Sequence, residues 1–248
     1  MGVQPEGRRG ADGARPLVWG AVPAAGSGSR MGSSVPKQYL EIAGARLAEH
    51  TLGALLAAGC IHEIVVAIAP DDALWPTLPE ALRARVRTVH GGDERAASVL
   101  NALDGFSQRP APGDWVLVHD MARPCVRPER IRAMIDELGR DEVGGLLALP
   151  LVDTLKRADG AQRVRETVDR SALWRAQTPQ VFRFGVLERA LREARASGVT
   201  ITDEAMAVER LGLAPRLLTG SADNIKVTIA DDMELADYYL SRRRGKPA

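Results

Sequence analysis

Short apolar runs alternate with longer amphipathic stretches along most of the chain. Continuous apolar runs, such as residues 61–69, predict strands covered on both faces, whereas residues 46–58 carry their leucines on one face of a helix. This alternation is typical of βα units, so the expected fold class is α/β: a doubly wound, mostly parallel, Rossmann-like sheet. We predict strands at 17–24, 61–69, 86–89, 115–118, 144–150, 216–218 and 225–227, and helices at 46–58, 94–106, 128–138, 184–196, 203–211 and 231–240.

The rhythm of strands and helices breaks between residues 151 and 170. Two short strand-like pieces, 152–156 and 163–168, flank Ala158-Asp159-Gly160-Ala161, which is a turn signal. We therefore expect a β-hairpin arm at about 151–170 that protrudes from a single domain of residues 17–242. Residues 1–16 are rich in Gly, Arg and Pro and are expected to be a disordered leader.

Composition excludes several functional classes. Lys and Arg together number 33 against 32 Asp and Glu, so no global field favours nucleic acid or an anionic membrane, and neither is expected as a partner. No stretch approaches the roughly 20 apolar residues that cross a bilayer. Cys60 and Cys125 show neither disulfide nor zinc spacing. These features favour a cytoplasmic protein that binds anions through locally placed cations.

The first predicted strand runs into a segment of small residues that contains Ala24, Ala25, Gly26 and Gly28 and is followed by the cations Arg30 and Lys37. Small residues let backbone N–H groups approach a polyphosphate closely, and two cations could counter its charge. Met31 stands where a dinucleotide fingerprint needs a third small residue, and the P-loop pattern fails as well. An exposed loop with solvated charges explains this segment alone equally well.

Two acidic residues follow predicted elements at informative positions. Asp120 ends a buried strand, at the edge where open α/β sheets bind ligands, although alone it could simply cap the next turn. Asp93 could be the N-cap of the helix at 94–106. His119 is interpreted as a structural residue, because one histidine beside a strand end is more often a satisfied neighbour than a catalyst.

Further short motifs follow in a fixed order, and they are Gly91-Gly92-Asp93-Glu94-Arg95 with Ser98, Val118-His119-Asp120 with Ala122-Arg123-Pro124, Asp153-Thr154-x-Lys156, Thr167-Val168-Asp169-Arg170, Gln177-Thr178-Pro179-Gln180, Thr202-Asp203-Glu204-Ala205 and Asp223-Asn224-Ile225-Lys226-Val227-Thr228. With the small-residue loop they span residues 23–232. In this order and spacing they resemble the family of 2-C-methyl-D-erythritol 4-phosphate cytidylyltransferases of the non-mevalonate isoprenoid pathway. Each motif alone is weak, and the combination is specific.

The resemblance implies an enzyme that transfers CMP from CTP to 2-C-methyl-D-erythritol 4-phosphate and releases pyrophosphate, with Mg²⁺ as cofactor. The matching catalytic positions are Arg30, Lys37, Arg170 and Lys226. The matching nucleotide-binding positions are Ala24, Ala25, Gly26, Gly28, Gly92, Asp93, Ser98, Asp120 and Met121, and Asp120 also matches the metal ligand. The matching acceptor-binding positions are Arg123, Thr154, Thr178 and Thr202.

The resemblance also implies a homodimer in which the arms of two subunits cross, so that Arg170 reaches the partner's active site. One position departs from the family pattern: Met121 stands where an Ala is usual. If its backbone contacts the ribose, we expect the methionine side chain to point away.

Three alternatives to this function remain. A sister cytidylyltransferase for ribitol 5-phosphate or a related polyol phosphate would share the CTP half of the site. An NAD-dependent dehydrogenase is disfavoured by Met31 and by the lack of the expected acidic residue after the second strand. A non-catalytic binding homologue is disfavoured because the expected catalytic residues, including Lys37 and Asp120, are intact.

Overall fold

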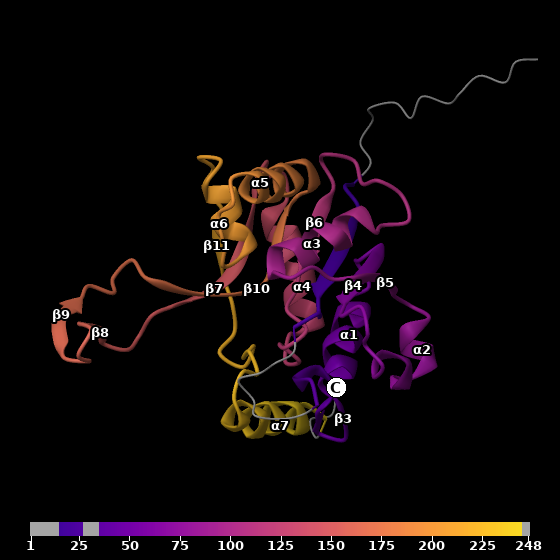
Figure 1. The fold of residues 1–248 in the computed structure, drawn as a ribbon, viewed down its shortest axis with the longest axis horizontal. Coiled ribbons are helices and arrows are strands. Elements are labelled where there is room, and N and C mark those ends of the chain that lie inside the picture. The colour runs from indigo at the N-terminus through magenta and orange to yellow at the C-terminus, as the bar shows by residue number, and fades with distance from the viewer. Residues whose placement is uncertain (1–14, 27–34, 245–248) are drawn as a thin grey trace, which may run out of the picture.

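A seven-stranded sheet forms the centre of the protein, and helices cover both of its faces (Figure 1). The computed structural model describes residues 15–26 and 35–244. Strand β10 runs antiparallel to both of its neighbours, whereas the other pairs are parallel, which confirms the predicted α/β class. In sheet order the strands are β11 (Arg216–Thr219), β7 (Gly144–Pro150), β10 (Trp174–Arg183), β6 (Trp115–Val118), β1 (Val18–Pro23), β4 (Glu63–Ile68) and β5 (Arg87–His90).

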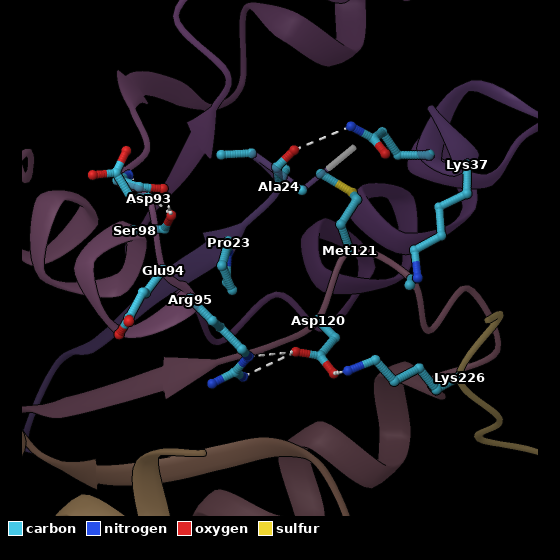
Figure 2. Close-up of a pocket in the computed structure, with 15 residues that line it drawn as sticks. Pro23, Ala24, Lys37, Asp93, Glu94, Arg95, Ser98, Asp120, Met121 and Lys226 are labelled. Carbon is cyan, nitrogen blue, oxygen red and sulfur yellow. Dashed lines mark hydrogen bonds and ion pairs between the residues drawn. The ribbon is translucent and has the colours of Figure 1, made fainter. Parts of the chain in front are cut away.

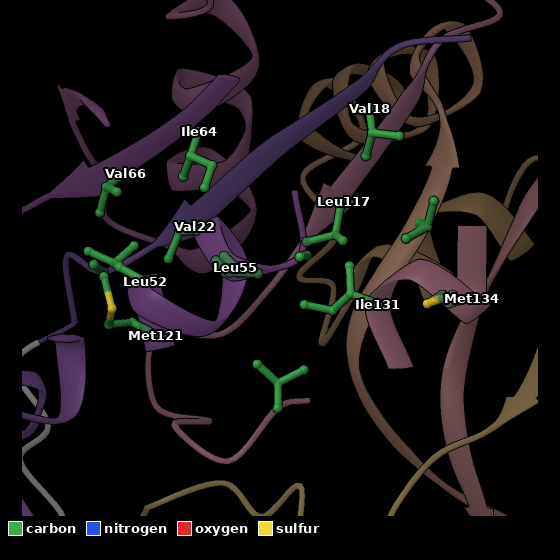
Figure 3. Packing of buried hydrophobic residues seen from close by; sticks show 14 of the residues in the cluster. Val18, Val22, Leu52, Leu55, Ile64, Val66, Leu117, Met121, Ile131 and Met134 are labelled. Carbon is green, nitrogen blue, oxygen red and sulfur yellow. The ribbon is translucent and has the colours of Figure 1, made fainter. Parts of the chain in front are cut away.

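Each face of the sheet has its own hydrophobic core. Helices α1 (Leu47–Ala57) and α4 (Pro128–Leu138) pack on one face, and α3 (Arg95–Asp104), α5 (Phe184–Ala196) and α6 (Glu204–Glu209) pack on the other. Strand β1 serves both cores because successive strand residues point to opposite faces. Val18 and Val22 join the core of α1 and α4 (Figure 3), and Trp19 and Ala21 join the opposite core.

Smaller elements complete the chain: η2 (Lys37–Tyr39), β2 (Glu41–Ile42), β3 (Ala45–Arg46), η3 (Trp75–Thr77), α2 (Glu80–Arg83) and the last helix α7 (Ala230–Arg244). A third core cluster joins α7 to the β2–β3 region through Ile42, Leu47, Ala236 and Leu240. Within residues 15–26 and 35–244, no helix is long and apolar enough to cross a membrane.

Strand β10 was not predicted, and it lies near the middle of the sheet. Its sequence contains the polar run from Gln177 to Gln180 with Pro179, which does not read as a central strand. The register against β7 shifts between Ala176 and Gln180, which marks a β-bulge. The bulge accommodates the proline, and residues 177–180 are buried by tertiary contacts that periodicity does not reveal.

The predicted strand at 225–227 is wrong. These residues form no strand. Val227 donates its N–H to the carbonyl of Ala122, and the Arg123 side chain donates to the carbonyl of Asn224. The segment is therefore held against the loop after β6 by separate contacts, and no neighbouring strand pairs with it.

The arm at residues 151–170 projects away from the body as a two-stranded sheet (Figure 1). Strands β8 (Leu155–Ala158) and β9 (Val164–Val168) pair antiparallel, which confirms the predicted hairpin. Asp159 stabilises the turn by accepting from the backbone N–H groups of Ala161 and Arg163. Val152 and Val164 are 76% and 65% exposed, so the arm has apolar surface that the body of this chain does not cover.

Candidate active site

A pocket lies at the carboxyl ends of β1 and β6, beside the start of α3 (Figure 2). This is the edge at which open α/β sheets bind ligands. The pocket gathers many of the predicted site residues, namely Ala24, Ala25, Gly26, Lys37, Gly92, Asp93, Ser98, Asp120, Met121 and Lys226. It also contains Pro23, Gln38, Glu94, Arg95 and Ala122, for which the sequence suggested no role. Segments distant in sequence therefore form one site.

The loop after β1 and the loop before α3 approach each other closely. A Cβ added to Gly91 would lie 2.4 Å from the Cβ of Ala25 and 2.9 Å from the hydroxyl of Ser98, so a side chain there would clash. Gly92 donates its N–H to the Ser98 hydroxyl at 3.1 Å. Glycine at position 91 thus lets the small-residue loop after β1 rest against the loop before α3.

Helix α3 begins one residue later than predicted. Its N-cap is Glu94, which makes no side-chain capping bond, so Asp93 is not the N-cap. Asp93 is exposed and lines the pocket together with Ser98, while Lys37 and Lys226 lie toward the opposite end (Figure 2). The pocket therefore has one end with an acidic side chain and a hydroxyl, and another end with cations.

Asp120 is the centre of the charged cluster in the pocket. Its Oδ1 accepts from Nε and Nη2 of Arg95 at 3.1 and 2.9 Å, and its Oδ2 pairs with Nζ of Lys226 at 2.8 Å. Burial alone raises the pKa of Asp120, but Arg95 and Lys226 outweigh it and hold that pKa well below its usual range. The carboxylate is therefore ionised at any physiological pH.

Arg95 is shared between two acidic residues. Besides its bonds to Asp120, its Nη1 donates to the carboxylate of Glu204, the first residue of α6. Burial raises the pKa of Glu204, and the charge of Arg95 opposes that rise. Both residues lie in the motifs described above, but the sequence predicted no role for either of them. Their contact spans 109 positions of the chain, so no local pattern indicates it.

His119 and Thr178 lie beneath the pocket and order its floor. The Thr178 hydroxyl accepts the backbone N–H of Asp120 at 3.0 Å and lies 3.1 Å from Nδ1 of His119. Nε2 of His119 lies 3.2 Å from the carbonyl of Arg123. Complete burial lowers the pKa of His119 to about 4, so the ring is neutral at pH 7. These contacts agree with the structural interpretation of His119.

The bulge of β10 connects the loop after β6 with the C-terminal segment that carries Lys226. The Gln177 amide donates to the carbonyl of Ser221 at 2.9 Å, and Asn224 donates to the carbonyl of Thr178 at 2.8 Å. Because Thr178 also holds Asp120, the unpredicted strand brings the two partners Asp120 and Lys226 together.

The structure shows how Met121 and Lys37, two of the predicted site residues, are oriented at the pocket. Met121 is 4% exposed, and its side chain packs in the core with Leu52 (Figure 3). Its carbonyl accepts the Thr51 hydroxyl. The side chain therefore points into the protein, which is the orientation expected if the Met121 backbone contacts the ribose. Lys37 donates from Nζ to the carbonyl of Val227 at 2.9 Å, so this cation borders the segment of Lys226.

The four predicted acceptor-binding residues and the catalytic candidate Arg170 do not line the pocket. Arg123 is buried beside it, with Nε 3.7 Å from Oδ2 of Asp120. Thr202 is exposed just before α6. Thr154 and Arg170 are exposed on the arm, where their side chains meet at 3.4 Å. Thr178 has its hydroxyl engaged internally, as described above.

The remaining predicted residues Gly28 and Arg30, as well as the leader up to residue 14, lie outside the described residues. Their predicted roles thus rest on the sequence alone.

The fold and the pocket together define an α/β protein with a small-residue loop, two lysines and a buried carboxylate at the carboxyl ends of its parallel strands. This arrangement is suited to binding a nucleotide polyphosphate. Nucleotidyltransferases are a class of α/β protein with such a site.

Comparisons with known proteins identify the family. The sequence model of 2-C-methyl-D-erythritol 4-phosphate cytidylyltransferase matches residues 18–242. Proteins of that name from Pseudomonas putida (strain GB-1) and Vibrio vulnificus (strain YJ016) are 52% and 50% identical, over 92% and 91% of this chain and 98% and 95% of their own lengths. This chain belongs to the 2-C-methyl-D-erythritol 4-phosphate cytidylyltransferase family.

Solved structures agree with this assignment. The Francisella tularensis 2-C-methyl-D-erythritol 4-phosphate cytidylyltransferase is 32% identical, with a TM-score of 0.78 over 90% of this chain and 99% of its own. The Thermus thermophilus protein of the same name is also 32% identical, with a TM-score of 0.75 over 91% and 99%. The predicted family is confirmed, and a dehydrogenase is excluded.

Proposed function

We propose that this chain transfers CMP from CTP to 2-C-methyl-D-erythritol 4-phosphate, forming 4-diphosphocytidyl-2-C-methyl-D-erythritol and pyrophosphate. The observation that carries the proposal is the single pocket that unites the loop at residues 24–26, Lys37, Asp120 and Lys226 in a member of this family. In this reaction a phosphate oxygen of the acceptor attacks the α-phosphorus of CTP while pyrophosphate leaves in line. Both reactants are anions, so alignment and charge neutralisation supply most of the catalysis.

The nucleotide would lie along the pocket with cytosine toward Ser98 and the triphosphate toward Lys37. Backbone groups of Gly92 and Asp93 and the Ser98 hydroxyl provide polar contacts for a base edge, and backbone N–H groups of residues 24–26 can approach the phosphates. Lys37 would exchange its contact with the Val227 carbonyl for the triphosphate. Arg30, the other cation predicted for this loop, would also contact the triphosphate.

The donor set of the pocket fits a Mg²⁺ ion that arrives with the nucleotide. Among the described residues no group of three or more His, Cys, Asp or Glu could hold a metal by itself. Mg²⁺ is commonly held by one or two carboxylates together with substrate phosphates. A carboxylate has about four lone-pair positions, and Asp120 uses two on Oδ1 and one on Oδ2. Oδ2 of Asp120 would therefore hold the ion, which would neutralise charge on the triphosphate.

The acceptor phosphate would lie near Lys226 and Arg123, with Thr202 and Thr178 at the periphery of its site. Thr154 and Arg170 cannot serve the pocket of their own chain in this conformation, because the arm projects away from the body (Figure 1). We propose a homodimer in which the arms cross and Arg170 acts in the partner's site, with Thr154 beside it. The exposed apolar residues of the arm, including Val152 and Val164, support such an interface.

The free thiols Cys60 and Cys125 favour a cytoplasmic location for this enzyme. Fractionation of cells that express a tagged chain would test the location, and recovery outside the cytoplasmic fraction would contradict it.

The function is tested by measuring pyrophosphate release with Mg²⁺, CTP and a panel of C4 and C5 polyol phosphates. We expect the highest kcat/KM with 2-C-methyl-D-erythritol 4-phosphate. A higher value with ribitol 5-phosphate would assign a sister acceptor instead. Turnover with ATP or GTP equal to that with CTP would contradict a cytidylyltransferase altogether.

A further inference from the structure

Glu204 is a buried carboxylate that the proposed reaction does not use directly. Its side chain is fully buried, it does not line the pocket, and its hydrogen-bond partner among the described residues is Arg95. Its second oxygen, Oε2, is buried without a hydrogen-bond partner in the described part of the chain. A buried carboxylate that is only half satisfied destabilises the fold, so its presence calls for a reason beyond packing.

Arg95 explains what Glu204 can do. The guanidinium is a rigid fork: two of its nitrogens, Nε and Nη2, converge on Oδ1 of Asp120 (Figure 2). Its third nitrogen, Nη1, donates to Glu204. The Arg95 side chain keeps 24% of its surface exposed in the pocket. Glu204 is the group that holds Nη1, and without it the fork could turn toward the phosphates of a bound nucleotide.

Hydrogen bonds within the chain hold Glu204 in place without a bound nucleotide. Gln180 on β10 accepts the N–H of Ala205 and donates to the carboxylate of Asp203, each at 2.9 Å. Asp203 in turn caps α6 by accepting the N–H of Met206. The start of α6 is therefore attached to the sheet, and Glu204 is a fixed point from which Arg95 can be oriented.

We propose that Glu204 is a positioning residue for the proposed reaction: by holding Arg95 it fixes the Asp120 carboxylate, so that Oδ1 stays bound to Arg95 and the lone pair of Oδ2 that Lys226 does not occupy can receive the nucleotide's divalent cation. The inference rests on the proposed function. It assigns Arg95 to the orientation of Asp120 and not to direct contact with the phosphates. A merely structural Glu204 would anchor α6 without affecting the metal.

The test compares Glu204→Gln, Arg95→Lys and the double variant with the wild-type chain. The primary measurement is Mn²⁺ affinity in the presence of a non-hydrolysable CTP analogue, followed by electron paramagnetic resonance of the free ion. Glu204→Gln is expected to weaken Mn²⁺ binding about tenfold and to lower kcat about tenfold. This is the usual effect of removing a residue that orients a metal ligand. The KM for the acceptor should stay unchanged.

The double variant tests whether Glu204 acts through Arg95. If it does, Arg95→Lys with Glu204→Gln should bind Mn²⁺ no more weakly than Arg95→Lys alone. Multiplied losses, or a Glu204→Gln variant with wild-type Mn²⁺ affinity, would overturn the proposal. Glu188→Gln is the matched control, because it breaks the ion pairs of α5 to Arg109 and Arg192 away from the pocket, and it should leave Mn²⁺ affinity unchanged.

The experiment remains decisive if Glu204→Gln unfolds or if the wild-type chain shows no turnover. If Glu204→Gln unfolds, as judged by its Tm, Arg95→Lys decides: weaker Mn²⁺ binding supports the proposal, and unchanged binding overturns it. If the wild-type chain does not turn over 2-C-methyl-D-erythritol 4-phosphate, the proposed function fails, but the Mn²⁺ titration needs no turnover and still reports on Glu204.

Discussion

Charged side chains occur both around Asp120 and along the arm, but only the group around Asp120 is built on a buried carboxylate. Asp120 is 7% exposed and contacts Arg95 and Lys226 at 2.8–3.1 Å. Arg170 on the arm is exposed and contacts Thr154 at 3.4 Å, the outer limit for a hydrogen bond. Another arm pair, Arg157 with Glu166, keeps 61% and 49% of the two side chains exposed.

This difference separates two kinds of contribution to a site. A buried and mutually oriented cluster is preorganised, so it can stabilise developing charge without first ordering its own side chains. A pair on an exposed hairpin contributes little by itself, because solvent screens it and a two-stranded hairpin is marginal alone. The pocket is thus ordered by its own chain, whereas the role proposed for the arm requires a second chain.

The largest expected effect is in the pocket. Lys37→Ala should lower kcat by on the order of 10²–10³, because it removes one cation that would stabilise the charge developing on the triphosphate. Steady-state kinetics with CTP and 2-C-methyl-D-erythritol 4-phosphate measure this, and Arg30→Ala is expected to behave alike. Arg192→Ala, an exposed cation of α5, is the control. A near wild-type kcat with only a raised KM would show that Lys37 acts in ground-state binding.

The next effect tests whether the arm serves a second chain. Arg170→Ala should lower activity by about 10², and mixing it with Lys37→Ala under conditions that exchange subunits should restore activity. Half of randomly exchanged dimers are mixed, and one of their two sites has both residues intact, so about a quarter of wild-type activity should return. Native mass spectrometry confirms exchange. No recovery despite exchange would mean that Arg170 acts within its own chain.

The smallest effect concerns the support beneath the pocket. Thr178→Val keeps the side-chain shape but removes the hydroxyl that accepts the Asp120 N–H and meets His119. Leaving these buried groups unsatisfied should lower the free energy of unfolding by about 1–3 kcal/mol, which thermal or urea denaturation measures. Thr219→Val, at an exposed position of β11, is the control. Equal stability of the two variants would show that Thr178 does not support the Asp120 loop.

Local patterns in the sequence were enough to predict most of the helices and strands, because amphipathic and apolar periodicity reports burial directly. The arm was predicted for the same kind of reason, since the turn at residues 158–161 is stabilised within a few residues by Asp159. Most residues that the family resemblance implies for nucleotide binding also meet in one pocket. They lie in short motifs at the ends of predicted elements, and the ends of parallel strands share one edge.

Contacts between distant segments decided the rest. The sequence by itself did not reveal β10, because its bulge and Pro179 hide the strand pattern, and with β10 it missed the contacts of Gln177, Thr178 and Gln180. Nor did it reveal the pairing of Arg95 with Glu204 across 109 positions. Charge pairing of this kind leaves no periodic signal along the chain, so the tertiary structure alone decided how the Asp120 carboxylate is held.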